Sequence, residues 1–398
     1  MRMLDRKYEP LPAAELEQLQ LERLQALIVR VRRNVRRYRE TLGEARVTTL
    51  SDVQQLPVTT PDDLLTAFPY GMFALPLREV IRLHSAVGPD GRQIVIGHTR
   101  NDLTNWGRLT ARQLSAAGVT AHDVIQICFE AGTLPGTAGY VLGAERIEAS
   151  VIAEDPFHIE YQLAMLQNYR ATVLITTPSN AAGLVRLLAS RRVDPQSLSL
   201  RAVLLSRPVP ASEREALRAG LFADIRCSFG VPEILDPGLC VECASGRLHV
   251  NEDHFLVEVK DGELLVSTLC REAMPLLRYR TRIACEIRRE KCPCGRTGAV
   301  LLPGERLDDR LRVNEKPLYR SQIAGVLART GAAGRAFDVD ILEDKVLLRL
   351  ALTADLFSDT MRTLFSLKQE IESEFFSRLG ILTEVRFVEP RGIPHKQA

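Results

Sequence analysis

The chain has 398 residues, more than the roughly 250–300 residues at which a single hydrophobic core stops growing, so we expect two domains. Its composition, 45% hydrophobic and 26% charged residues, is that of an ordinary globular protein. The 52 basic and 50 acidic residues leave a formal net charge of +2, which excludes a strong electrostatic attraction of the whole chain to nucleic acid. The sequence has neither a bilayer-spanning apolar run nor a signal peptide, so we expect a cytoplasmic protein without a membrane partner.

Apolar residues at helical spacing predict one helix over residues 13–41. Six arginines between residues 30 and 39 could contact an anionic surface, but a solvated helix face is the simpler interpretation. From residue 93 to 228, short apolar strands alternate with helices, which predicts a parallel sheet covered on both faces. The predicted strands are 93–97, 124–129, 149–153, 172–176, 201–206 and 224–228, and the predicted helices are 100–117, 136–145, 159–169, 180–190 and 211–220.

The pattern changes twice in the second half of the chain. Short strands within residues 247–288, with Asp261-Gly262 as a turn, predict an antiparallel region. A polar stretch over 304–310 then precedes a further set of elements, predicted as helices 321–328 and 356–379 and strands 336–341, 345–352 and 384–388. We therefore expect an α/β fold with a large N-terminal domain, 1–305, whose mixed and mostly parallel sheets are covered by helices. A small α+β C-terminal domain, 306–398, completes it.

Cysteine is distributed unevenly, since seven of the eight cysteines lie between residues 227 and 294. In a large chain without a signal peptide, such clustering indicates metal binding or burial rather than disulfides. Four residues have the spacing of a closed, structural zinc site, with no position left for water: Cys243, His249, Cys292 and Cys294. Alternative ligands are Cys240, Cys285 and His254, and the competing interpretation, buried free thiols, fits Cys227 and Cys270.

A loop over residues 85–92 contains two glycines and precedes a predicted strand. Glycine-rich loops bind phosphate because their backbone N–H groups can converge, although an ordinary turn is the competing interpretation here.

Six segments of the chain resemble, in order, the phenylacetate–CoA ligases and their relatives: 56–60, 82–85, 98–103, 248–255, 278–282 and 292–297. The strings Glu-Asp-His-Phe and Tyr-Arg-Thr-Arg are specific to this branch of the adenylate-forming superfamily, and the resemblance runs from about residue 25 to 392. It implies that a carboxylic acid, expected to be aromatic, reacts with ATP–Mg to give an acyl-adenylate and pyrophosphate. A thiol of CoA or of an acyl carrier protein then displaces AMP, while the small domain moves.

The resemblance also implies roles for individual residues. Three residues are implied to be catalytic: Glu233 would hold magnesium, Asp308 would be the hinge residue, and Lys396 would be the adenylating lysine. The implied nucleotide contacts are Gly88, Gly91, Arg92, Phe229, Gly230 and Arg306. The cysteine/histidine set corresponds to a zinc site of this branch. The acid pocket is expected near residues 129–140 and 176–180. A homodimer is one option that the sequence leaves open.

Five departures from the family pattern all concern ATP. Asp90 stands in the phosphate loop, Pro232 replaces a threonine, and Ile283 replaces an aspartate. The adenine-side loop reads Ser-Arg-Pro over 206–208, and the C-terminal segment is shortened around Lys396. Two hypotheses follow. The favoured one is a ligase with altered ATP contacts, and the alternative is a homologue that does not adenylate and binds an acid or acyl thioester as an acyl-transfer, accessory or sensor protein.

Overall fold

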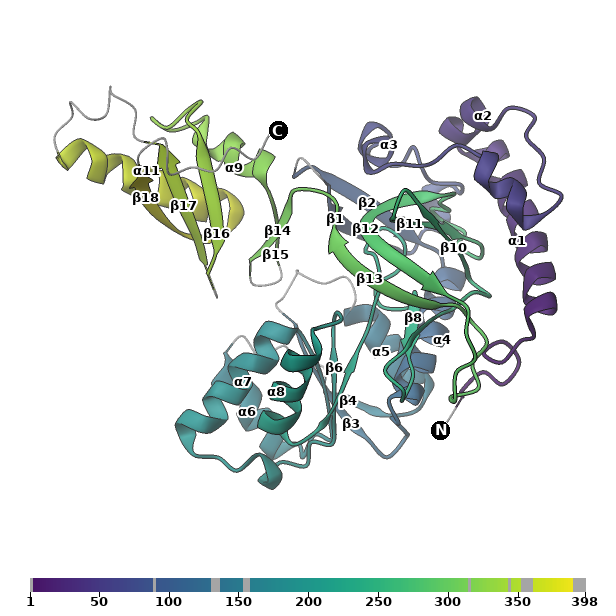
Figure 1. The fold of residues 1–398 in the computed structure, drawn as a ribbon, viewed down its shortest axis with the longest axis horizontal. Coiled ribbons are helices and arrows are strands. Elements are labelled where there is room, and N and C mark those ends of the chain that lie inside the picture. The colour runs from purple at the N-terminus through teal and green to yellow at the C-terminus, as the bar shows by residue number, and fades with distance from the viewer. Residues whose placement is uncertain are drawn as a thin grey trace. The chain divides into compact units, whose positions relative to one another are not determined.

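The computed structural model describes residues 3–88, 91–129, 137–152, 158–313, 316–342, 345–351 and 361–388, the last without the side chains of 361 and 362. The chain divides into two compact units, one made of Met1–Ala86 with Gln93–Leu307 and the other of Val87–Arg92 with Asp308–Ala398. Figure 1 shows the elements of both units along the chain. None of the described helices is both long and apolar enough to cross a membrane.

A five-stranded parallel sheet forms one layer of the first unit, in the order β4-β3-β5-β6-β7. Its strands are β3 (Val124–Cys128), β4 (Ser150–Ile152), β5 (Val173–Thr176), β6 (Ala202–Leu205) and β7 (Asp224–Cys227). The connecting helices are α5 (Thr137–Arg146), α6 (Ile159–Asn168), α7 (Pro178–Arg191) and α8 (Ala211–Leu221). The predicted alternation of strands and helices is confirmed in this region.

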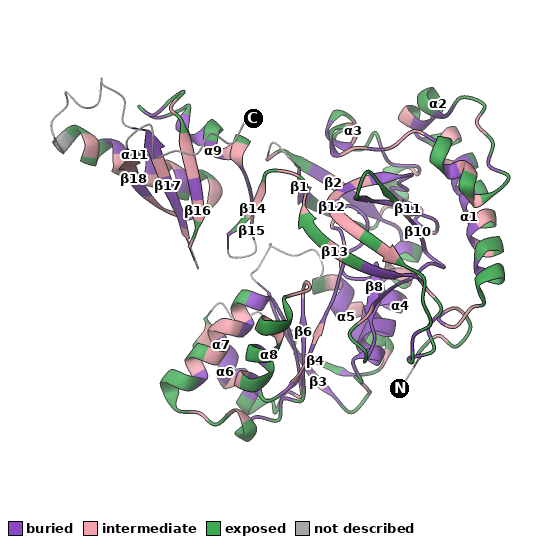
Figure 2. Cartoon of the chain, viewed as in Figure 1, coloured by how far each residue is buried: buried purple, intermediate pink, exposed green. Residues whose placement is uncertain are grey.

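Helices cover both faces of this sheet (Figure 1). Leu174 and Val203 pack with residues of α6, α7 and α8, whereas their neighbours Ile175 and Leu204 pack with residues of α5 and of α4 (Arg100–Ala116). Successive side chains of a strand point to opposite faces, so a strand covered on both faces is apolar throughout. All four residues of β5 are buried for this reason, and Figure 2 shows buried strands between helices with exposed outer faces.

A six-stranded sheet forms the other large layer of the first unit, in the order β10-β11-β12-β13-β9-β8. All its adjacent pairs are antiparallel. Its strands are β8 (Cys240–Glu242), β9 (Leu248–Val250), β10 (Phe255–Lys260), β11 (Glu263–Thr268), β12 (Tyr279–Arg288) and β13 (Val300–Arg306). The antiparallel region predicted over residues 247–288 is confirmed, and β8, β9 and β13 extend it. The sheets of this unit are therefore mixed, but not mostly parallel as expected, because hairpins replace the crossover helices after residue 240.

The hairpin between β10 and β11 has a direct local cause. Lys260 pairs with Glu263, so only Asp261 and Gly262 connect the strands. Both residues have positive φ, 53° and 77°. Two-residue hairpin turns with positive φ at both central positions match the twist of the strands, and Asp-Gly is among the sequences that favour them.

The N-terminal helix is interrupted. One helix was predicted over 13–41, but Val35 is extended, with φ −110° and ψ 117°, and separates α1 (Ala13–Asn34) from α2 (Arg36–Leu42). Val35 is fully buried, so the break keeps the apolar face of both helices on the core. The side chains of Arg32 and Arg37 donate to backbone carbonyls of the same unit. At least part of the arginine run therefore fastens the helices to the body of the unit.

Shorter elements complete the first unit. They are the helix α3 (Pro61–Thr66), the 3₁₀ helices Leu50–Gln55, Leu77–Glu79 and Pro195–Ser197, and the two-stranded sheet of β1 (Arg82–Val87) and β2 (Gln93–His98). Strand β1 was not predicted, because the glycines that follow it led us to interpret residues 85–92 as a loop.

The described part of the second unit contains a three-stranded sheet, the helices α9 and α11, and a hairpin. Strand β16 (Phe337–Ile341) is antiparallel to β17 (Lys345–Ala351), which is parallel to β18 (Leu382–Val388). Helix α11 (Met361–Leu379) connects the parallel pair and buries Ile371 and Phe375 against the sheet, next to α9 (Arg320–Leu327). The hairpin of β14 (Arg310–Val313) and β15 (Lys316–Tyr319) was not predicted.

Asp123 anchors the amino end of β3 through several hydrogen bonds. Its carboxylate accepts from the Arg201 guanidinium at 2.5 and 2.8 Å, from the Thr172 hydroxyl at 2.7 Å and from the Thr120 N–H at 2.8 Å. Burial opposes ionisation, but these donors outweigh it and lower the pKa of Asp123 from 3.8 to about 2. The carboxylate therefore stabilises the fold above about pH 4, and this contribution is lost as the pH falls toward 2.

Asp123→Asn should lower the free energy of unfolding by about 1–2 kcal/mol at pH 7, because charge-assisted hydrogen bonds are lost. Urea unfolding at pH 7 and between pH 4 and 2 measures the effect, and the difference from the unchanged protein should shrink over the acid range. Asp224→Asn, which removes a half-exposed carboxylate from the same sheet, is the control. If the variant and the unchanged protein differ by the same free energy of unfolding down to pH 2, the ionised Asp123 carboxylate does not have this stabilising role.

Candidate functional site

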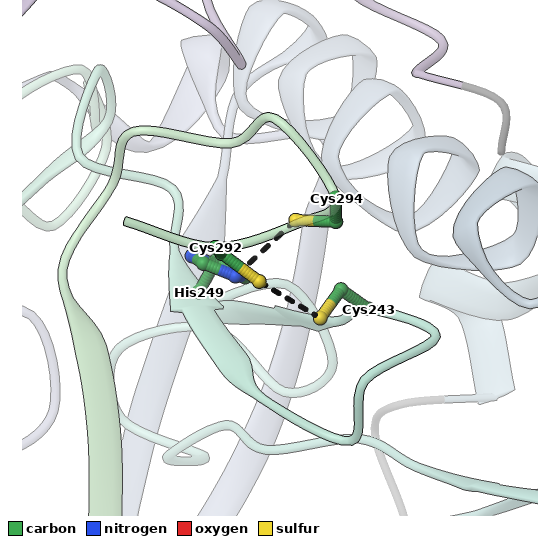
Figure 3. A group of neighbouring side chains, drawn as sticks. All are labelled: Cys243, His249, Cys292 and Cys294. Carbon is green, nitrogen blue, oxygen red and sulfur yellow. Dashed lines mark hydrogen bonds between the residues drawn. The ribbon is translucent and has the colours of Figure 1, made fainter. Parts of the chain in front are cut away.

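Four of the predicted ligands meet in one buried cluster (Figure 3). Cys243 follows β8, His249 lies in β9, and Cys292 and Cys294 belong to the loop between β12 and β13. Their donor atoms all lie within 4.8 Å of one another, with 3.7 Å between the sulfurs of Cys243 and Cys292 and 3.5 Å between Cys294 Sγ and His249 Nε2. Three thiols and an imidazole that converge in this way form a donor set that could hold a metal ion such as zinc.

Two tight turns position the cysteine sulfur atoms of the cluster. Gly246 and Gly295 have positive φ, 71° and 82°, and donate their N–H groups to the carbonyls of Cys243 and Cys292. Burial raises the pKa of the Cys243 thiol, but backbone N–H groups of the first turn more than compensate and hold it below its ordinary value. Because the thiolate is the metal-binding form, these donors prepare the site for a cation.

His249 is oriented by a backbone carbonyl. Its Nδ1 lies 2.9 Å from the carbonyl oxygen of Gly298, so Nδ1 carries the proton and Nε2 is left as an acceptor. Nε2 is the atom that faces Cys294. A hydrogen bond of this kind fixes the tautomer and ring position of metal-binding histidines, so the donor set fits a resident metal.

The N-terminal segment is fastened to the same loop. Arg296, two residues after Cys294, forms a buried ion pair with Glu9 at 2.6 Å, and both side chains are 3% exposed. The Thr297 N–H donates to the Glu9 carbonyl, and the Thr297 hydroxyl donates to the Leu11 carbonyl at 2.6 Å. These contacts hold residues 9–11 against the metal-binding loop.

The purified chain should carry one equivalent of metal, lose it in Cys292→Ser, and unfold at a lower temperature when the metal is removed by a chelator. Elemental analysis with a thermal melt measures both effects. Cys285→Ser, a half-buried thiol outside the cluster, should keep the metal. Freely titratable thiols at the four positions, with no stoichiometric metal, would contradict this expectation.

Glu9→Gln should destabilise the protein by about 3 kcal/mol, because it leaves the buried Arg296 guanidinium without its counter-charge. Denaturant unfolding measures the change, and the exposed Glu17→Gln should alter the free energy of unfolding by less than about 0.5 kcal/mol. Equal effects of the two substitutions would show that the ion pair does not hold the segment.

A second group of predicted residues lies at the carboxyl edge of the parallel sheet. Phe229, Gly230 and Glu233 follow β7 in a compact turn, and Phe229 and Glu233 are buried. A Cβ on Gly230 would lie 2.5 Å from the Leu235 carbonyl oxygen, so the turn requires glycine there. Ser206, directly after β6, has a buried hydroxyl without a hydrogen-bond partner in the described part of the chain. Ligands of open α/β sheets bind at this edge.

The other predicted nucleotide contacts are distributed over both units. In the second unit, the Gly88 N–H donates to the Arg92 carbonyl at 2.8 Å and the Gly91 N–H donates to the Gly88 carbonyl at 2.9 Å. Arg306 ends β13 in the first unit, and Asp308 is half-buried in the second unit. Asp90, Lys396 and residues 130–136 of the expected acid pocket lie outside the described residues.

Sequence reasoning missed one buried group of the first unit. His84 Nδ1 lies 3.2 Å from His98 Nε2, and the His98 ring stacks on Trp106 with 5.0 Å between centroids. Burial and the nearby Arg271 guanidinium lower the pKa of His84 to about 4. These histidines lie in two of the segments that carry the family resemblance, but no spacing pattern indicated that they meet.

Comparisons with known proteins place the chain among curated and solved relatives, although none of the protein-family models matches it. The chain is 36% identical over 346 residues to a phenylacetate–coenzyme A ligase of Thermus thermophilus, which covers 82% of this chain and 78% of that protein. It is 28% identical to a phenylacetate–coenzyme A ligase of Escherichia coli over 98% and 95% of the two chains. Among solved structures, 2-hydroxyisobutyryl-CoA ligase with 2-HIB-AMP and CoA aligns with a TM-score of 0.88 at 20% identity, over 98% of this chain and 90% of that chain, which shows a shared fold.

Proposed function

Because the chain belongs to the phenylacetate–coenzyme A ligase family of the adenylate-forming superfamily, we propose that it is an acid–thiol ligase that couples a carboxylic acid, in our proposal an aromatic one, to coenzyme A. The observation that carries the proposal is the turn after β7. This turn holds the buried Phe229 and Glu233 at the carboxyl edge of the parallel sheet, beside a strand end whose Ser206 hydroxyl has no partner in the described part of the chain. Such an edge suits a nucleotide and the acid that reacts with it.

The reaction would proceed in two balanced steps. A carboxylate oxygen attacks the α-phosphorus of ATP, and pyrophosphate leaves as the acyl-adenylate forms. The sulfur of coenzyme A, or of a carrier-protein thiol, then attacks the acyl carbon; AMP leaves and the thiol proton is released. Phosphate charge in the first step would be stabilised by the side chains of Arg92 and Lys396, while Gly88 and Gly91 would let the backbone of their turn approach the phosphates closely.

We assign the remaining predicted residues accordingly. Phe229 with Gly230 would pack on adenine, and Glu233 would hold magnesium, which neutralises phosphate charge when bound. Arg306 and Asp308 lie where a hinge between an N-terminal domain, 1–305, and a C-terminal domain, 306–398, would allow the small domain to move between steps. The Cys₃His cluster would hold zinc in a structural role, because its four ligands leave no open position. We expect the enzyme in the cytoplasm.

A second candidate function rests on the nucleotide contacts themselves. Ile283 is buried, pairs with Arg306 between β12 and β13, and offers no acceptor to a ribose hydroxyl. The N–H groups of Gly88 and Gly91 are engaged within their own turn. These observations favour a homologue that binds an acid or an acyl thioester, as an acyl-transfer, accessory or sensor protein, without adenylating the acid.

Incubation with ATP–Mg and a panel of aryl acids separates the two candidates. The ligase should release pyrophosphate with at least one acid and then form its thioester with coenzyme A or with a carrier-protein thiol, measured by a coupled pyrophosphate assay and by mass spectrometry. The second candidate is supported if an acid or thioester binds by calorimetry but neither pyrophosphate release nor ATP binding is detected across the panel.

Glu233→Gln should lower the rate of pyrophosphate release by about 100-fold, because it removes the carboxylate assigned to magnesium and leaves a similar shape. The variant should also need more magnesium for half-maximal rate, which a titration measures. The exposed Glu215→Gln on α8 is the matched control and should leave both quantities unchanged. An unaltered magnesium dependence of Glu233→Gln would refute the assignment.

A further inference from the structure

The four residues of the metal-binding cluster (Figure 3) differ in how firmly the fold holds them. His249 lies in β9, which pairs with β8 and with β13, and Cys243 directly follows β8. Cys292 and Cys294 instead belong to the metal-binding loop, residues 289–299, which connects β12 and β13. All four residues are at most 9% exposed, so a bound metal can leave only when part of this cage opens. The loop, which supplies two of the four ligands, is the part that can move.

The two ends of the metal-binding loop are fixed to the body of the first unit by one carboxylate. Glu252 is 2% exposed, and its oxygens accept from the Arg289 guanidinium at 2.6 and 3.2 Å and from the Ala299 N–H at 2.8 Å. Arg289 and Ala299 are the first and last residues of the loop. Glu252 therefore restrains both ends, and motion is left to the tip of the loop, which carries the two cysteines.

The tip is held by a different part of the chain, residues 3–12, which we call the N-terminal strap. Glu9 accepts from Arg296 Nε at 2.7 Å, and both side chains are 3% exposed. Arg296 also donates its backbone N–H to Cys294 Sγ at 3.4 Å. Movement of the tip away from the cage would separate this ion pair, and breaking a buried ion pair is strongly unfavourable. Glu9 therefore opposes the motion that would remove Cys294 from the cluster.

Two further contacts join the strap to the tip. The Thr297 hydroxyl donates to the Leu11 carbonyl at 2.6 Å. The terminal methyl group of Met3 lies against Gly295, because a Cβ added to Gly295 would be 3.0 Å from it. The Gly295 N–H donates to the Cys292 carbonyl and closes the turn that contains both cysteines of the loop. The strap therefore contacts this turn directly.

The strap is itself anchored away from the loop, on α4. The Asp5 carboxylate accepts from Arg108 Nε at 2.9 Å and from Arg112 Nη2 at 2.8 Å. Within the strap, the Asp5 N–H donates to the Glu9 carboxylate at 2.8 Å, and the Glu9 N–H donates to the Asp5 carbonyl at 3.1 Å. This closed turn connects Glu9 to α4, so the strap restrains the tip from a separate part of the fold.

We propose that the N-terminal strap retains the metal of the cluster, and that Glu9 is the positioning residue through which it does so. The strap supplies no ligand. It raises the free energy of the tip opening through which the metal would leave, so a resident metal is released slowly, and faster when the strap is loosened. The proposal does not depend on the ligase function.

Release of zinc into an excess of a chromophoric chelator measures this opening. Zinc should leave Glu9→Gln roughly tenfold faster, or more, than it leaves the unchanged protein. The exposed Thr297→Val, which loses one hydrogen bond to the strap, should release it about fivefold faster. The exposed Glu17→Gln is the matched control and should leave the rate unchanged. Leu174→Ala, in the core of the parallel sheet, destabilises the fold away from the strap and should also leave the rate unchanged.

The absorption of the cobalt(II)-loaded variants distinguishes positioning from loss of the site. Glu9→Gln should keep the thiolate-to-cobalt and d–d bands of the unchanged protein, because all four ligands remain. Equal release rates in Glu9→Gln and the unchanged protein, or a chain that binds neither zinc nor cobalt, would overturn the proposal. If Glu9→Gln does not fold, an unaltered rate in Thr297→Val does the same. Equally fast release from Leu174→Ala would also overturn it, because the rate would then follow overall stability.

Discussion

The buried guanidinium of Arg112 joins three parts of the first unit, and their mutual placement depends on it. It projects from α4 and is 1% exposed. It bonds both oxygens of Asp253 at 2.8 Å, the Asn251 side chain at 3.0 Å and Asp5 at 2.8 Å. Burial raises the pKa of Asp5, but the arginines beside it prevail and lower it to about 2. A charge this deep is tolerated only because its partners are charged and well placed.

The two chemically interesting regions lie on either side of this connection. The loop of Asn251 and Asp253 directly follows β9, which carries His249, so Arg112 supports the metal-binding cluster from the side of α4. The same helix carries Trp106, which forms a wall of a cavity bordered by His98 and Arg271. Helix α4 therefore contacts both the loop beside the metal-binding cluster and the histidines that pack on Trp106.

Several buried polar side chains hold the first unit together through paired contacts. Asp253, Asn251 and Glu9 have their hydrogen-bonding groups engaged by arginines or by backbone, as expected of residues that hold a fold together. Ser206, His98 and Arg271 keep unengaged buried atoms among the described residues. Buried atoms without a partner among the described residues also occur at Arg112, Gln113 and Gln126, so they are not confined to the carboxyl edge of the parallel sheet.

The sequence by itself determined the elements whose cause is local. Apolar runs such as Val173–Thr176 and the helices between them follow from periodicity, and the Asp261-Gly262 turn follows from the backbone freedom of its residues. The four metal-ligand candidates could be named as well, because cysteines at short spacing, next to a glycine that permits a tight turn, are typical of a zinc site. Val35, which breaks the first helix, could not be anticipated, because its extended conformation is set by the burial of its side chain.

Only the tertiary structure decided which distant residues meet. Cys243 and Cys292 are 49 positions apart, and His98 and Arg271 are 173 positions apart; sheet pairing and helix packing bring each pair together. The contacts of the His98 ring and of the Arg271 guanidinium depend on neighbours that no spacing reveals. Periodicity is a property of a single segment, so the sequence could predict individual strands and helices. Hydrogen bonding and burial depend on pairs of residues in the folded chain, so only the structure could show which distant side chains meet.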